Sequence, residues 1–146
     1  MYDLPRFSSD LCAVLVRSRH GHTKVVEQAR KMSGGSEFVV ALEPSEGIEK
    51  KLLPAYLGAA IRQCEGNMHS SSISMEIILF VAGTMNIEKA VNTSVAKGDE
   101  FVLFASRTGS VNYLESRFDL HVVKKYDLRI SNVDSGVAIT AIKYDK

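Results

Sequence analysis

Residues 67–91, NMHSSSISMEIILFVAGTMNIEKAV, contain the pattern that decides the fold. A run of serines precedes an almost wholly apolar segment, which breaks at Gly83 and restarts as a polar, charged segment. Serine and asparagine are preferred N-cap residues, and glycine commonly ends a helix, so the stretch predicts two helices, over residues 72–82 and 86–96. The first of these is apolar on nearly every face, which is typical of a helix buried within its domain or under a partner.

Elements of both kinds are predicted on either side of this stretch. Runs of branched and apolar residues predict strands over residues 11–17, 37–43, 101–105, 120–128 and 137–144. Apolar periodicity predicts further helices over residues 23–32, 48–66 and 110–119. This intermixed order predicts an α/β (α+β) fold, with residues 1–146 as one domain and a central mixed sheet of about four or five strands packed against several helices.

The composition is that of an ordinary globular chain of 146 residues, with 45% hydrophobic and 24% charged residues. A formal net charge of +1 argues against a strong overall field for polyanions but allows local basic patches. Cys12 and Cys64 lie in apolar segments and are expected to be reduced core thiols. The N-terminus lacks a signal-like apolar core and the apolar run 77–83 is too short to span a bilayer, so a cytoplasmic protein without a membrane partner is predicted.

Residues 67–72 are a candidate anion site. A helix N-terminus offers unpaired backbone N–H groups and a partial positive charge, and Ser70, Ser71 and Ser72 add hydroxyls there, with Asn67 and His69 close by in sequence. Such a site suits a phosphate. The alternative is that one serine is only the N-cap and the others are loop residues.

Other candidate contacts are less specific. Basic residues gather in three places: Arg17, Arg19 and Lys24; Lys50, Lys51 and Arg62; Lys124, Lys125 and Arg129. Such groups are usually solvated, but a basic groove that leads to a helix N-terminus can bind a short single strand of nucleic acid, with Tyr56 or Tyr113 available for base stacking. Next to the expected N-cap Asn86, the side chains of Met85, Ile87 and Val91 form either an exposed apolar edge or part of the core.

The sequence offers no convincing catalytic set. His20 and His22 are closely spaced but have no cysteine or carboxylate nearby to complete a metal site. His69 beside the serines comes nearest to a base with a nucleophile, yet no orienting acid accompanies it. Neither a phosphate-binding loop nor a dinucleotide-binding motif is present. We therefore expect a protein that is not an enzyme and has no metal or cofactor.

Residues 57–91 closely resemble the small accessory subunits of the KEOPS complex, the TPRKB-like family. In that family a serine cap opens a helix of pattern S-x-E-I/L-L, followed by a small-Gly-Thr break and a helix of pattern Asn/Gln-Ile-x-x-Ala-Ile/Val. The matching residues are Ser72, Ser74, Glu76, Ile77, Leu79, Ala82, Gly83, Thr84, Asn86, Ile87, Ala90 and Val91. The resemblance is sharp over about a quarter of the chain and favours an archaeal member, although many archaeal members carry arginine where this chain has Met85.

The resemblance implies a non-catalytic subunit of a complex that helps to form threonylcarbamoyladenosine in tRNA. Family members bind and stimulate a kinase-like (PRPK-like) ATPase subunit, and in archaeal complexes they capture the 3′ CCA end of tRNA. The implied tRNA-binding residues are Lys51, Arg62, Asn67, His69, Ser71 and Ser72. The implied partner-binding residues are Met85, Asn86, Ile87 and Val91, and a weak homodimer is left open.

Two alternatives belong to other functional classes. A homo-oligomeric small-molecule-binding regulatory domain would bury the apolar helix against a second copy and hold a phosphorylated metabolite at the serines. A small hydrolase would use His69 and a serine.

Overall fold

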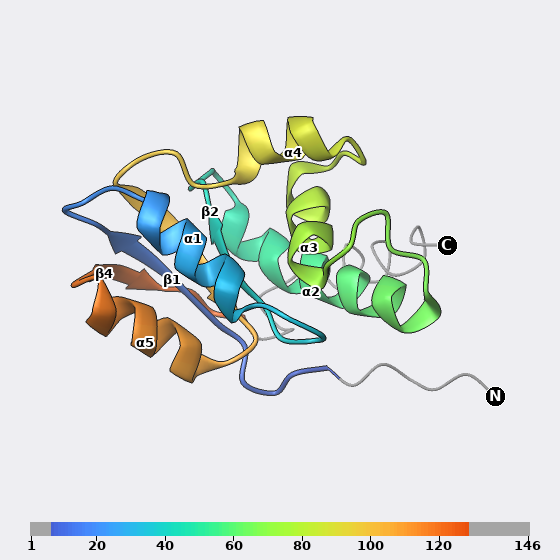
Figure 1. Ribbon diagram of the computed structural model, residues 1–146, viewed down its shortest axis with the longest axis horizontal. Coiled ribbons are helices and arrows are strands. Elements are labelled where there is room, and N and C mark those ends of the chain that lie inside the picture. The colour runs from blue at the N-terminus through green and yellow to red at the C-terminus, as the bar shows by residue number, and fades with distance from the viewer. Residues whose placement is uncertain (1–6, 129–146) are drawn as a thin grey trace.

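The computed structural model describes residues 7–128 (Figure 1). Its helices and strands are β1 (Cys12–Arg17), α1 (Thr23–Met32), β2 (Val39–Leu42), α2 (Ile48–Glu65), α3 (Ile73–Ala82), α4 (Ile87–Ser94), β3 (Glu100–Ala105), α5 (Thr108–Arg117) and β4 (His121–Lys125). Every element predicted within these residues is present, with boundaries shifted by a few residues. The strand predicted over residues 137–144 and the predicted cation Arg129 lie outside the described residues. In the described part of the chain, no helix is both long and apolar enough to cross a bilayer.

The sheet has four strands in the order β2-β3-β1-β4. The predicted fold class and strand number are confirmed, but the sheet is antiparallel at every pairing of the described strands rather than mixed. α1 joins β1 to β2 while β3 lies between them, and α5 joins β3 to β4 while β1 lies between them. These two interlocking split β-α-β units leave α2, α3 and α4 as an insertion between β2 and β3.

Helices cover both faces of the sheet (Figure 1). On one face, α1 and α5 pack against inward side chains such as Val14 and Leu103. On the other face, α2 and α3 pack against Val40, Phe104 and their neighbours. Successive strand residues point to opposite faces, so a strand covered on both sides is apolar at every position, as the buried sequence FVLFA of β3 shows.

Helix α3 begins and ends as predicted. The Ser72 hydroxyl accepts a hydrogen bond from the backbone N–H of Met75 at 3.2 Å. Gly83 ends the helix in the left-handed conformation, with φ of 69°. Most of α3 is buried against α2 and the sheet, so its apolar character is explained within the domain.

The prediction that both cysteines are core thiols is half wrong. Neither forms a disulfide within residues 7–128, and burial raises the pKa of the Cys12 thiol. Cys64, however, is exposed. The buried residues of α2 run from Ile48 to Arg62 and cover most sides of the helix in its middle, whereas Cys64 lies beyond them in the last turn.

Gly58 of α2 packs directly against the side chain of Phe80 in α3. A methyl group added there would lie 2.5 Å from the Phe80 ring, and that ring also lies under the Arg62 guanidinium, 4.2 Å from it. Gly58→Ala is expected to destabilise the protein by about 1–3 kcal/mol through overpacking, despite the better helix propensity of alanine. The measurement is urea unfolding followed by circular dichroism.

Gly109 in α5 is the matched control, because nothing lies within 4 Å of a methyl group added there. Gly109→Ala is expected to stabilise the protein by about 0.4–1 kcal/mol. Changes of the same sign in the two variants would contradict the packing that we describe at Gly58.

Candidate functional site

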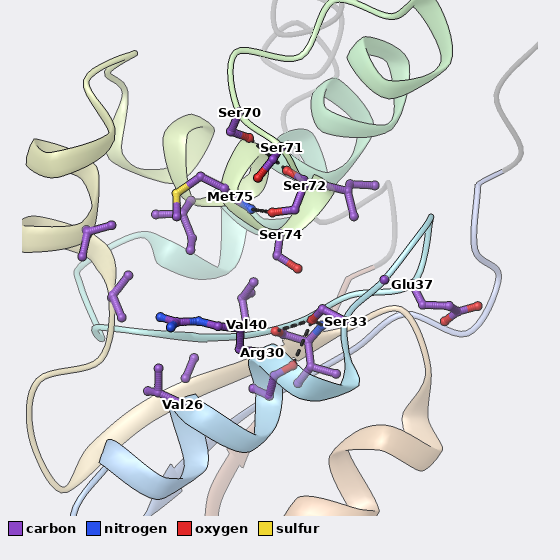
Figure 2. Close-up of a pocket in the computed structure, with 18 of the residues that line it drawn as sticks. Val26, Arg30, Ser33, Glu37, Val40, Ser70, Ser71, Ser72, Ser74 and Met75 are labelled. Atoms are coloured by element: carbon purple, nitrogen blue, oxygen red, sulfur yellow. Dashed lines mark hydrogen bonds between the residues drawn. The ribbon is translucent and has the colours of Figure 1, made fainter.

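A groove of about 740 Å³ lies at the outer edge of β2, between α1, α3 and α4. We call it the β2 groove. Its walls carry apolar side chains, among them Val26, Val40, Ile78 and Val91. Figure 2 shows the serines at the start of α3 on one side of this space and α1 with β2 on the other. The structure therefore brings the serine cluster against elements that lie far from it in the sequence.

β2 is an edge strand of the described sheet, and neighbouring loops bond to its outer edge on both sides of Val40. At one end, the Ser33 hydroxyl accepts from Val39 N–H at 3.0 Å. At the other end, Ala96 N–H donates to Ala41 O at 3.1 Å. These contacts satisfy parts of an edge that would otherwise pair with another strand, and the space between them is left to the groove.

Two of the three clustered serines are used inside the protein. Ser72 is the N-cap of α3. The backbone N–H of Ser70 donates to Glu76 Oε1 at 2.8 Å, and its hydroxyl lies 3.1 Å from the same oxygen. The alternative of a cap plus loop residues therefore describes Ser70 and Ser72 better than a phosphate cradle does. Ser71 is exposed, so its hydroxyl can meet a ligand.

Ser74, which was not among the predicted contacts, points into the β2 groove (Figure 2). Its Oγ atom is buried and has no hydrogen-bond partner among the described residues. Leaving a buried hydroxyl unsatisfied costs about 1–3 kcal/mol, so a ligand atom that bonds to it would recover part of that cost. Its signal in the sequence is weak, because a serine in the first turn of a helix is common.

Arg62 was predicted to contact tRNA, and the structure corrects this. Its guanidinium lies in the interior, 3.0 Å from Glu76 Oε2, with both side chains buried. Glu76 is the one acidic residue of an apolar helix, and a buried carboxylate requires a cation and hydrogen-bond donors. Arg62 and Ser70 supply these, so both residues serve the fold.

Three other predicted tRNA contacts, Asn67, His69 and Lys51, are exposed but do not line the groove. Asn67 and His69 lie on the loop between α2 and α3, and the Asn67 amide donates to Glu65 at 3.3 Å. Lys51 precedes Gln63, the α2 residue that does line the groove, by twelve positions. That spacing is about 18 Å along a helix, so Lys51 is not beside the serines.

The cation at the groove is Arg30 of α1, which sequence reasoning missed. It is exposed, lines the groove, and forms no ion pair within the described part of the chain. Figure 2 shows Arg30 on the α1 side of the groove, across from the serines. Arg30 is some forty residues from the serine cluster, and only the packing of α1 beside β2 places it there.

The predicted apolar edge near α4 is exposed rather than part of the core. Met85 and Ile87 are 58% and 42% exposed, and Asn86 caps α4 by accepting from Lys89 N–H at 3.0 Å. Ile87 and Val91 also line the groove, so this edge and the groove are continuous.

The two tyrosines considered for base stacking differ in their surroundings. Tyr56 is buried and its hydroxyl accepts from Ser8 N–H at 2.7 Å, so it cannot stack on a base, and burial raises the pKa of its phenol. Tyr113 is exposed, but it belongs to α5 on the opposite face of the sheet from α3.

Over residues 7–128, no three His, Cys, Asp or Glu side chains lie close enough to hold a metal ion, and no hydrogen bond joins His69 to a serine. No protein-family model matches the chain, and no curated protein matches it significantly.

Proposed function

We propose that this protein is a non-catalytic subunit of a KEOPS-type tRNA-modifying complex. It binds the single-stranded 3′ CCA end of tRNA in the β2 groove, and it binds a kinase-like ATPase subunit through the apolar edge at Met85 and Ile87. The observation that carries the proposal is the combination, in one groove, of apolar walls, the cation Arg30 and the hydroxyls of Ser71 and Ser74, none of which has an ion-pair or hydrogen-bond partner for its side chain within residues 7–128. As such a subunit, the protein would act in the cytoplasm.

The apolar part of the groove suits a nucleobase. Val40, Ile78 and Val91 provide flat apolar contact, and the volume of about 740 Å³ lies in the range of about 300–1,000 Å³ typical of ligand sites. The Ser74 hydroxyl, buried and without a partner, can bond to a polar atom on the edge of a base.

The polar rim suits a phosphate. A guanidinium presents several N–H donors in a fixed plane that matches phosphate oxygens, and Arg30 forms no competing ion pair within residues 7–128. Ser71 adds an exposed hydroxyl on the opposite wall. Arg30 thus replaces Arg62 and Lys51 as the proposed phosphate contact.

The apolar edge supports the proposed protein partner. Large apolar side chains such as Met85 are enriched at the centres of protein interfaces. Because Ile87 contributes both to this edge and to the groove, a bound ATPase subunit would lie beside the RNA tail. In this proposal the protein also stimulates the ATPase subunit that it binds.

Arg30→Glu is the direct test. Its affinity for a single-stranded RNA that ends in CCA, measured by fluorescence anisotropy, is expected to fall at least tenfold, because a charged hydrogen bond worth about 1.5–3 kcal/mol is replaced by repulsion. Lys51→Glu is the control, since it makes the same charge change on an exposed residue outside the groove. Equal losses in both variants, or no preference of the wild-type protein for the CCA end, would refute the groove assignment.

A second candidate is the homo-oligomeric regulatory domain that binds a phosphorylated small molecule, because the groove volume suits such a ligand equally well. Light scattering distinguishes the two. A KEOPS subunit forms a stable complex with the ATPase subunit, whereas the regulatory domain forms a homo-oligomer whose mass does not change when that subunit is added.

A further inference from the structure

We propose that RNA bound in the β2 groove continues along α1 to a second cationic surface, which binds phosphates upstream of the 3′ tail. This surface consists of Arg19, Lys24 and Arg117, and we call it the α1–α5 surface. The inference rests on the proposed function and extends it from a pocket for the RNA end to a path for the strand.

Two adjoining hollows form the α1–α5 surface. One, of about 440 Å³, is lined by Lys24 at the start of α1 and by Arg117 at the end of α5. The other, of about 360 Å³, is lined by Arg19 and His121. Asp119 borders both hollows, so the two are neighbours on the surface.

The three cations of this surface are free to bind an anion. Arg19, Lys24 and Arg117 are exposed and form no ion pair within residues 7–128. In contrast, Arg17 at the same edge is held by Glu100 at 3.0 Å. Three cations at one surface, without ion pairs within residues 7–128, create a local positive potential that attracts a polyanion.

The acidic groups near this surface are few. Asp119 borders the hollows. Asp99 lies near Gly21, because its Oδ1 atom would be 3.9 Å from a Cβ atom added to that glycine. Glu100 is already paired with Arg17. Among the described residues, Asp119 is thus the carboxylate that would most repel a phosphate bound at the α1–α5 surface. Removing its charge should therefore increase the affinity for RNA.

Helix α1 connects the surface with the β2 groove. Lys24 and Val25 line the first hollow, while Val26 and Arg30 line the groove. Arg30 lies six positions after Lys24, which is about 9 Å along the helix axis and about a third of a turn around it. About three or four nucleotides of a strand at about 3.4 Å each can span that separation. A strand whose last nucleotides lie in the groove can therefore place its preceding phosphates at the α1–α5 surface.

The experiment compares two RNAs, a hairpin with an unpaired 3′ tail ending in CCA and the isolated single-stranded tail. In the variant Arg19→Ala/Lys24→Ala/Arg117→Ala, hairpin affinity is expected to fall at least tenfold. The slope of log affinity against log salt should fall by about 2–3, since each lost phosphate contact removes about 0.9. Affinity for the isolated tail should stay within twofold of wild type. The control variant is Lys50→Ala/Lys51→Ala/Lys89→Ala, which removes three exposed lysines from α2 and α4.

Asp119→Asn tests the same surface by a gain of affinity. Asp119 has a φ of 51°, a left-handed conformation that asparagine tolerates, so the variant should fold normally. Hairpin affinity is expected to rise about fivefold, the effect of one close charge–charge contact in water.

The outcomes separate this inference from the proposed function. Unchanged hairpin affinity and salt slope in the triple variant, with tail binding intact, would overturn the α1–α5 surface and leave the proposed function standing. If the wild-type protein binds neither RNA, the proposed function fails and this inference fails with it.

Discussion

Glu76→Leu is expected to lower the free energy of unfolding by about 3–5 kcal/mol, the cost of breaking a buried ion pair by removing one partner. The change leaves the Arg62 guanidinium in the interior without its carboxylate, and it removes the acceptor of the Ser70 backbone N–H. Because that N–H holds the loop in front of α3, the groove wall formed by the serines should also loosen. Urea unfolding followed by circular dichroism measures the effect.

The surface pair Arg17–Glu100 is the control, since its charges are also 3.0 Å apart but its side chains are 61% and 41% exposed. Glu100→Leu is expected to change stability by less than about 1 kcal/mol. The double variant Arg62→Met/Glu76→Leu removes both buried charges and should recover most of the loss. A loss below 1 kcal/mol in Glu76→Leu alone would show that the carboxylate is not needed in the interior.

Phe104→Ala is expected to cost about 3–5 kcal/mol, the range for removing a fully buried aromatic ring. The Phe104 ring meets that of Phe38 edge-on at 5.0 Å, and Phe38 contacts Tyr56 at 5.3 Å. This chain of rings connects β3, the residue before β2 and α2, so the cavity would lie between the sheet and the inserted helices.

Two variants calibrate that result in the same unfolding experiment. Phe104→Leu keeps part of the apolar volume and is expected to cost clearly less than Phe104→Ala. Tyr113→Ala removes an aromatic ring that is 46% exposed and should lie within about 0.5 kcal/mol of wild type. A small loss for Phe104→Ala would mean that the core closes over the missing ring.

The helices and strands were predictable because their signals are local. Serine and asparagine caps marked the starts of α3 and α4, Gly83 marked the end of α3, and branched runs marked β1 and β2. Cap geometry and side-chain periodicity depend on residues within one or two turns, so a single sequence contains them. The sequence alone does not decide whether Met85 and Ile87 lie at the surface or in the core, because both environments accept such side chains.

The site was predicted only in part, because its contacts join distant segments. The serine cluster does lie at the groove. Arg62, the cation that was expected beside the serines because it is close to them in the sequence, is instead buried beside Glu76. The exposed cation at the groove is instead Arg30, on a helix before β2. A lysine or arginine in a sequence gives its charge but not its partner, and burial beside a carboxylate changes its role entirely.

The sequence by itself determined the α/β class, the position of nearly every described element and the caps of α3 and α4. Only the tertiary structure decided that the sheet is antiparallel, that Arg62 lies inside, and that Arg30 and Ser74 face one groove. The physical reason is that the two kinds of interaction act over different separations along the chain. Local backbone preferences depend on neighbouring residues. Strand order, charge pairing and the shape of the groove depend on segments far apart in the chain, which pack together to bury their apolar surfaces.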